Sequence, residues 1–170
     1  MTIARWVSAG ALLLALDGSH ARAGSADDPR PPAAEGVVLA GSPLAMERGS
    51  GETSFNFAHL RDLWVRVWLA GTATPVQLDL RLIDPQGTLI YEASVPYVSD
   101  PTIPTQEARP GEVPLTAFQA KTLGGWVALD YALPISGSVV TRFLSEGTWT
   151  LKVEAGGREF STSVDVRTDY

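Results

Sequence analysis

The sequence predicts an all-β domain in which seven to nine antiparallel strands form two packed layers, interrupted by one long Pro-rich loop. Two observations carry this prediction. From residue 37 onward, apolar and polar residues alternate with a period of two, and turn-forming residues break the pattern about every 8 to 12 residues. No long stretch has the spacing of an amphipathic helix. We therefore expect one β-sandwich domain over residues 37–170.

The first 23 residues have the pattern of an export signal. Arg5 precedes an apolar run over residues 6–16, and Ala21-Arg22-Ala23 forms a small-x-small cleavage site. The run is too short to cross a bilayer, which takes roughly 20 apolar residues. Residues 24–36, rich in Pro, Ala and acidic residues, read as a flexible leader. We expect a periplasmic or secreted domain with no membrane span after cleavage.

Four strands are predicted before the long loop. Each places apolar side chains on one face, and the turn Asp84-Pro85-Gln86-Gly87 separates the last two. The expected strands cover residues 53–57, 62–69, 76–83 and 89–95. Matching the apolar faces of the second and third strands predicts a hairpin that pairs Leu69 with Val76 and Val67 with Leu78.

The long loop is expected over residues 96–125. Five prolines between Pro96 and Pro114 would deny a sheet its amide donors. The roughly helical spacing of Leu115, Phe118 and Leu123 allows one short helical turn inside it. Loops longer than about 15 residues often carry function.

Four strands are predicted after the loop. Residues 126–133 and 139–144 are predicted strands, and residues 147–155 and 158–166 flank the two-residue turn Gly156-Gly157. That turn length pairs Ala155 with Arg158, which places Trp149 opposite Val164 on a mostly apolar face.

The closing segment carries a resemblance to a known family. Gly147-Thr148-Trp149-Thr150-Leu151-Lys152-Val153, with the Gly-Gly turn and Phe160, resembles the last hairpin of immunoglobulin-like domains, including fibronectin-III and macroglobulin-like modules. Leu82-Ile83-Asp84-Pro85-Gln86-Gly87 is similar to macroglobulin-like strands. The resemblance implies a single antiparallel immunoglobulin-like β-sandwich. The cysteine pair of the disulfide-bonded branch is missing.

Composition excludes several classes of function. The chain has no Cys, which removes disulfides, thiolate metal sites and cysteine nucleophiles. Its net charge is −6 and its Lys and Arg residues do not cluster, so nucleic-acid binding is disfavoured. His59 is the only histidine after residue 23, and no phosphate loop, dinucleotide fingerprint or nucleophile elbow is present. We expect no cofactor, no metal and no enzymatic activity, although a calcium site built from Asp100, Glu107 and Glu112 stays open.

One surface has residues typical of binding. The expected hairpin places Trp64, Arg66 and Trp68 on its outer face, beside Asp79 and Arg81. This arrangement resembles the Trp/Arg ladder of some fibronectin-III domains, and Trp126 is expected to be partly exposed near the loop. Such a face either stiffens the exposed sheet or packs under the loop or the leader, or it docks a partner or stacks on sugar rings. The candidate binding residues are Trp64, Arg66, Trp68, Asp79, Arg81 and Trp126.

Three hypotheses about function follow. The first is an exported non-catalytic module that binds a protein or a polysaccharide at the cell envelope. The second is an exported hydrolase, or an accessory subunit of one, that uses acids such as Asp79 or Asp130. The third is a structural spacer that assembles by edge-strand pairing.

Overall fold

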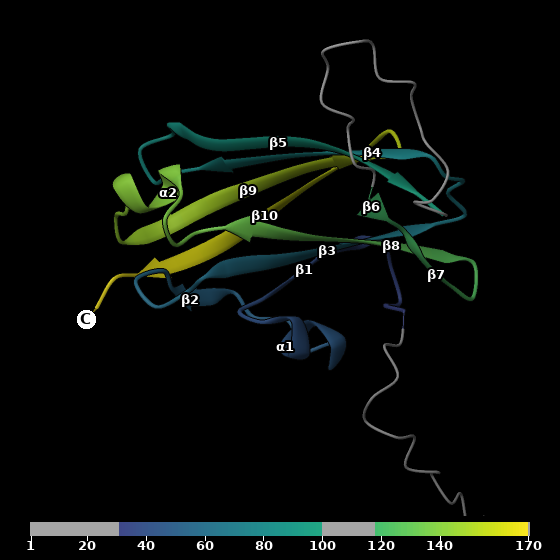
Figure 1. The fold of residues 1–170 in the computed structure, drawn as a ribbon, viewed down its shortest axis with the longest axis horizontal. Coiled ribbons are helices and arrows are strands. Elements are labelled where there is room, and N and C mark those ends of the chain that lie inside the picture. Colours follow the sequence, from purple (N-terminus) through teal and green to yellow (C-terminus); the bar gives the residue numbers. More distant parts are fainter. Residues whose placement is uncertain (1–30, 100–117, 170) are drawn as a thin grey trace, which may run out of the picture.

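The structure is a computed structural model that describes residues 31–99 and 118–169. The predicted signal peptide, the first part of the predicted leader and the candidate calcium residues Asp100, Glu107 and Glu112 lie outside this range. Within it, strands dominate and two short helices accompany them, α1 (Pro43–Glu47) and α2 (Val139–Arg142) (Figure 1).

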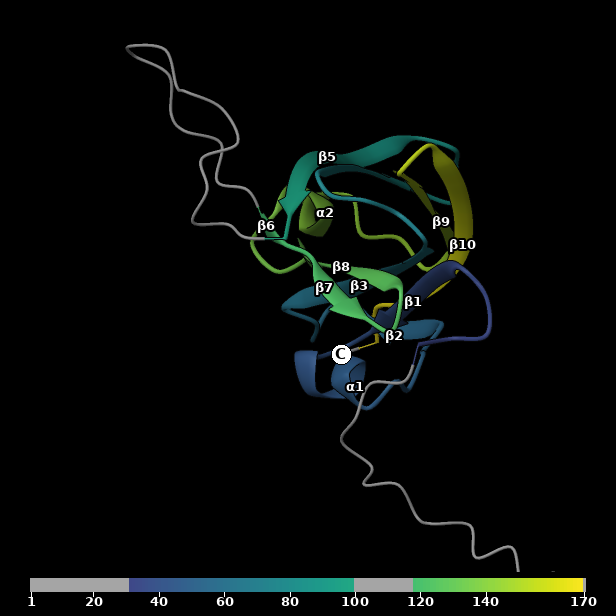
Figure 2. The ribbon, with the colours of Figure 1, turned by 90° about the vertical axis from the view of Figure 1, so that its right-hand side faces the viewer.

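The strands form two sheets whose apolar faces share one core. The four-stranded sheet has the order β1 (Gly36–Ala40), β3 (Asp62–Ala70), β8 (Trp126–Pro134) and β7 (Lys121–Leu123). The six-stranded sheet has the order β2 (Ser54–Asn56), β10 (Arg158–Arg167), β9 (Gly147–Ala155), β4 (Val76–Ile83), β5 (Leu89–Val98) and β6 (Phe118–Gln119). Figure 2 shows the six-stranded sheet curling around the core like half of a barrel.

The prediction of a two-layer, all-β fold is confirmed, but its purely antiparallel form is wrong. β2 runs parallel to β10, and β6 runs parallel to β5. Ten strands are present in the described residues, one more than the upper limit predicted. Three of them, β1, β6 and β7, are not among the predicted strands. β6 and β7 have two and three residues, too few for a two-residue period to be recognised.

The closing hairpin has the predicted register. Ala155 pairs with Arg158 and Trp149 with Val164, and Gly156 and Gly157 adopt the positive φ angles that a primed two-residue turn requires. The Trp149 side chain is fully buried in the core, as expected. The turn after β4 is confirmed as well, since the amide of Gly87 donates to the carbonyl of Asp84 at 3.0 Å.

Two local predictions are wrong. Residues 139–142 form α2 instead of a strand, because Ser138 caps its first turn through a side chain that accepts from the amide of Val140 at 3.1 Å. The stretch 96–125 is not one loop: β5 continues to Val98, and β6 and β7 follow before the turn Gly124-Gly125. Phe118 and Leu123 therefore lie in strands and not in a helical turn.

The predicted hairpin between residues 62–69 and 76–83 is also wrong. β3 pairs with β1 and β8, whereas β4 lies in the other sheet between β5 and β9. Both strands bury their Leu and Val residues in the same core. Matching apolar faces cannot distinguish strands that pair within a sheet from strands that face each other across the core.

The folded domain begins before residue 37. Glu35, placed in the predicted leader, accepts a hydrogen bond from the amide of Ala70 at 2.6 Å. Its other oxygen lies 2.8 Å from Nε of Arg158. This contact joins the start of β1 to both sheets, because Ala70 ends β3 and Arg158 begins β10.

Candidate functional site

The six candidate binding residues do not form one surface. Trp64, Arg66 and Trp68 on β3 share the outer face of the four-stranded sheet with Trp126 on β8. Asp79 and Arg81 lie on β4, on the outer face of the other sheet. The core separates the two groups, so the prediction that Arg66 lies beside Asp79 is wrong.

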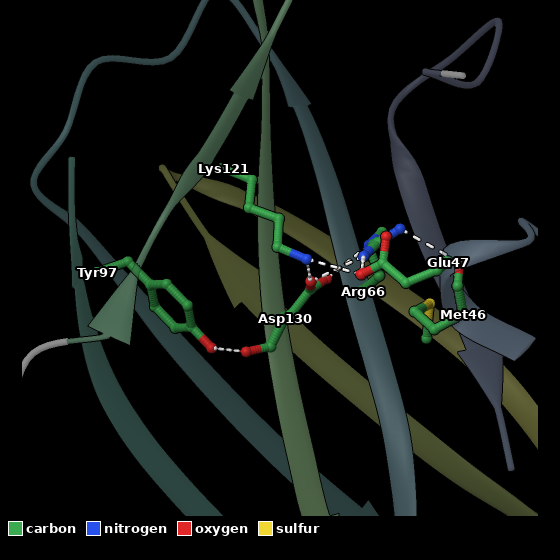
Figure 3. A network of polar contacts seen from close by, with 6 residues as sticks. All are labelled: Met46, Glu47, Arg66, Tyr97, Lys121 and Asp130. Atoms are coloured by element: carbon green, nitrogen blue, oxygen red, sulfur yellow. Dashed lines mark hydrogen bonds and ion pairs between the residues drawn. The ribbon is translucent and has the colours of Figure 1, made fainter. Parts of the chain in front are cut away.

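Arg66 instead lies in a closed network of polar contacts (Figure 3). Its side chain is only 3 % exposed. Nε lies 2.5 Å from Oδ1 of Asp130 and Nη2 lies 2.8 Å from Oδ2, which gives a two-point contact. Nη1 donates to the carbonyl of Met46 at 3.2 Å, and Nη2 also reaches Oε1 of Glu47 at 3.1 Å. These contacts hold α1 against β3 and β8.

Lys121 on β7 completes the network. Its Nζ lies 2.7 Å from Oε1 of Glu47 and 2.9 Å from Oδ2 of Asp130. The Tyr97 hydroxyl donates to the backbone carbonyl of Asp130. The network therefore joins two positive and two negative side chains from four elements. The buried charge of Arg66 is paired within it.

The network keeps both of its carboxylates ionised. The hydrogen bond from Lys121 is the largest cause that lowers the pKa of Glu47. Burial works to raise the pKa of Asp130, but the hydrogen bonds and charges of Arg66 and Lys121 outweigh it and leave that pKa below its usual value. Asp130 is thus unsuited to act as a general acid near neutral pH. Asp79 and Asp130, on the outer faces of different sheets, cannot act as a catalytic pair.

The tryptophans beside Arg66 are partly covered. The Arg66 guanidinium lies 5.6 Å from the ring centroid of Trp68, as expected of a Trp/Arg ladder. Trp68 packs edge-to-face on Trp126 with ring centroids 6.5 Å apart, and only 5 % of it is exposed. Helix α1, which is not among the predicted elements, lies on this face: Met46 is buried, and its carbonyl accepts from Arg66.

The outer face of the six-stranded sheet is open and charged. An open groove of about 530 Å³ crosses β4, β9 and β10, and Asp79, Arg81, Lys152, Glu154 and Glu159 line it. Arg81 forms an ion pair with Glu92 at 2.8 Å in which both side chains are about half exposed. Exposed pairs of this kind contribute little to stability.

The outer edge of β5 is the longest run of strand residues without a neighbouring strand among the described residues, and residues 158–164 of β10 form a shorter one. Residues 89–97 pair with β4 on one side, but on the other side only Tyr97 and Val98 pair, with β6. Of the ten residues of β5, the first eight therefore have no strand beside them among the described residues. The predicted strand over residues 89–95 does not reveal this edge, because an open edge depends on where the neighbouring strands end.

Apolar side chains flank the open edge of β5 at both ends. α2 contacts the beginning of β5, where Leu89 is 50 % exposed, Val139 41 % and Phe143 53 %. At the other end, Phe118 on β6 is 42 % exposed. Between them, the hydroxyls of Tyr91 on β5 and Tyr131 on β8 lie 2.6 Å apart. The edge of β5 thus faces β8 of the other sheet along a line that we call the seam, and α2 lies between the two sheets at one end of it (Figure 2).

Comparisons with known proteins supply no family. No protein-family model matches the chain, and no curated protein matches it in sequence. Within residues 31–99 and 118–169, no three acidic or His side chains gather as metal ligands would. The same residues contain no helix long and apolar enough to cross a membrane.

Proposed function

We propose that this protein is an exported, non-catalytic module that binds a partner protein at the cell envelope by accepting an extended segment of that partner along the open edge of β5. The observation that carries the proposal is the row of backbone groups along residues 89–96 that lacks a neighbouring strand among the described residues. The resemblance of the closing hairpin to immunoglobulin-like modules supports it only at the level of the fold.

An open strand edge is a ready binding site for an extended peptide. Every second residue of such an edge presents its N–H and C=O groups outward, and an added strand satisfies them with backbone hydrogen bonds. Eight residues span about 26 Å at roughly 3.3 Å per residue, which suffices for a stable addition. Pro96 and the register shift at Leu82 and Ile83 limit the row at its two ends, so pairing is confined to a defined segment.

The seam beside β5 would supply the apolar part of the contact. Tyr91, Ala93 and Val95 pack against the core from this edge and are only partly buried. Leu89, Val139, Phe143 and Phe118 add exposed apolar surface at the two ends. Grouped apolar side chains beside a free strand edge are typical of an interaction site.

The other hypotheses have less support. Binding of a polysaccharide to the Trp/Arg face has little support, because the side chains of Arg66 and Trp68 are buried and cannot stack on a sugar ring. A hydrolase that uses Asp79 and Asp130 would need the two acids on one site. A spacer that assembles by edge pairing would use an open edge of the same kind, on β5 or on residues 158–164 of β10, and self-association distinguishes it from a module that binds another protein.

Selection from a displayed library of random peptides on the purified protein tests the proposal. We expect peptides with alternating apolar residues, and expect the variant Ala93→Lys to lose at least about tenfold in affinity, because an added strand would bury the new charge. The control Ser163→Lys adds the same charge to an exposed position of β10, three strands away, and should bind normally.

A second measurement leaves the protein unaltered. Each selected peptide is made in two forms, N-methylated at its odd or at its even residues, so that one edge of the peptide strand loses its donors. Strand addition predicts that one form loses binding and that the other keeps it. Failure to select any peptide, or equal binding by both forms, contradicts the proposal.

A further inference from the structure

We infer that the strand accepted by β5 comes from a different protein and carries a Lys or Arg opposite Glu92, with apolar residues at the alternate positions, and that a second copy of this chain is a poor occupant. This inference rests on the proposed function and names the chemistry of its partner. It follows from the charges and the register along β5.

The outer side of β5 carries a net negative charge. Glu92 and Ser94 point outward and are exposed. On the adjacent strand, Arg81 pairs with Glu92 and Asp79 pairs with Ser94. Among the described residues Glu92 bonds only Arg81, through Oε1, and Asp79 accepts from the Ser94 hydroxyl without an ion pair of its own. The cations Arg81 and Lys152 line the groove on this face together with Asp79, Glu154 and Glu159, and Glu92 adds a further carboxylate, so negative charge is in excess.

A residue on an added strand would lie close to these carboxylates. Directly opposed side chains on neighbouring strands have Cβ atoms roughly 4.5–5.5 Å apart, and opposite charges at that distance attract. A Lys or Arg opposite Glu92 would contact Glu92 and lie diagonally opposite Ser94, whose other neighbour is Asp79. An acidic residue at the same position would be repelled.

The other side of the added strand would meet apolar surface. Tyr91, Ala93 and Val95 point toward the core, and the seam beyond them leads to Tyr131 and to α2. Because side chains alternate along a strand, the partner needs apolar residues on both sides of its basic residue in the sequence.

A second copy of the chain fits this edge badly. Two β5 strands related by a twofold axis would pair antiparallel. Outward-facing residues of one copy must lie opposite outward-facing residues of the other, and two registers meet this condition with the longest paired stretch. One of them places Glu92 opposite Glu92, which like charges disfavour. The other places Leu89 of the second copy opposite Tyr97, where Phe118 of β6 already pairs. The net charge of −6 on each chain adds a further repulsion between copies.

Labelled synthetic peptides test the inference with the full chain. Two nine-residue peptides share a sequence in which Thr and Val alternate. The central Thr is replaced by Lys in one peptide and by Glu in the other. By fluorescence anisotropy at low salt, we expect the Lys peptide to bind about fivefold tighter, with the difference shrinking as salt is raised.

Two charge-reversal variants locate the effect. Glu92→Lys should reverse the preference between the two peptides. The matched control Glu159→Lys makes the same change at an exposed position of β10 and should keep the preference for the Lys peptide. Sedimentation velocity should show a monomer.

The outcomes separate this inference from the proposed function. Equal affinity for both peptides, with binding abolished by Ala93→Lys, would overturn the charge rule while strand addition stands. A dimer that Ala93→Lys dissociates would overturn the exclusion of a second copy. Absence of binding by either peptide, together with an unsuccessful peptide selection, would remove the proposed function itself.

Discussion

The outer face of the four-stranded sheet and the open edge of β5 differ in what their residues suggest and in what they can do. The first holds Trp64, Arg66 and Trp68, which are residue types that dominate protein interfaces. Arg66 and Trp68 are nevertheless buried, and Arg66 is paired with Asp130. The second holds an ordinary sequence, yet its backbone is open on one side among the described residues. Accessibility and unmet hydrogen-bonding capacity are therefore better guides to a binding site than residue type.

The largest effect is expected from Asp130→Asn. The change leaves Arg66, 3 % exposed, without its two-point carboxylate contact, and loss of one partner of a buried ion pair costs about 3 kcal/mol of unfolding free energy. Urea unfolding measures it. The control Arg81→Gln removes an exposed pair and should leave the unfolding free energy unchanged. Equal losses of unfolding free energy in the two variants would mean that the Arg66–Asp130 pair is as exposed to solvent as the Arg81–Glu92 pair.

Acid should remove part of the same stabilisation. The pKa values of Glu47 and Asp130 lie below their ordinary values of 4.5 and 3.8, so the unfolded chain takes up protons first as the pH falls. The contribution of both groups is complete above their ordinary pKa values and is lost as the pH drops through the lowered ones. Urea unfolding from neutral pH to about pH 3 should show a shallower decline for Asp130→Asn than for the wild type.

Met46→Ala tests whether α1 is the cover of this face. Met46 is 1 % exposed and is the only buried residue of α1, so its truncation should cost about 2 kcal/mol of unfolding free energy. Iodide should then quench the tryptophan fluorescence more strongly, as Trp68 becomes accessible. Leu44→Ala, in the same helix but 59 % exposed, serves as the control. Unchanged quenching in Met46→Ala would show that α1 does not shield Trp68.

Tyr91→Phe probes the seam beside β5. The change removes one of two hydroxyls that lie 2.6 Å apart and should cost about 1 kcal/mol of unfolding free energy. A double-mutant cycle with Tyr131→Phe measures the coupling, because either single change already breaks the pair. Strict additivity of the two changes would show that the hydroxyls do not interact and that the seam is wider than the structure has it.

The smallest effect is expected from Lys121→Met. Lys121 is 54 % exposed, so its ion pairs with Glu47 and Asp130 should contribute only about 0.5 kcal/mol of unfolding free energy. Lys152→Met, on the open face of the other sheet, is the matched control. A loss as large as that of Asp130→Asn would place Lys121, and not Arg66, at the centre of the network.

The elements that the sequence predicted correctly are those whose signal is local. The turn Gly156-Gly157 and the alternation beside it define the register of the closing hairpin. The same holds for Asp84, whose carboxylate accepts from the amides of Gln86 and Thr88 within its own turn. These signals need no knowledge of the rest of the chain.

The elements that the sequence missed depend on distant contacts. The partner of Arg66 is Asp130, 64 positions away in the chain, and nothing near Arg66 distinguishes Asp130 from Asp79 as its carboxylate. The five-residue helix α1 is too short for a helical period to be recognised, although Ser42 before Pro43 is an N-cap signal. The open edge of β5 depends on where neighbouring strands end, which no local pattern reports.

Residue-resolved amide exchange of the free protein tests the central claim most directly. Along residues 89–95 of β5, every second amide should exchange rapidly, since it points away from β4, whereas the amides in the middle of β3, between β1 and β8, should all be protected. Addition of a selected peptide should then protect the rapid set. Uniform protection of β5 in the free protein would contradict an open edge.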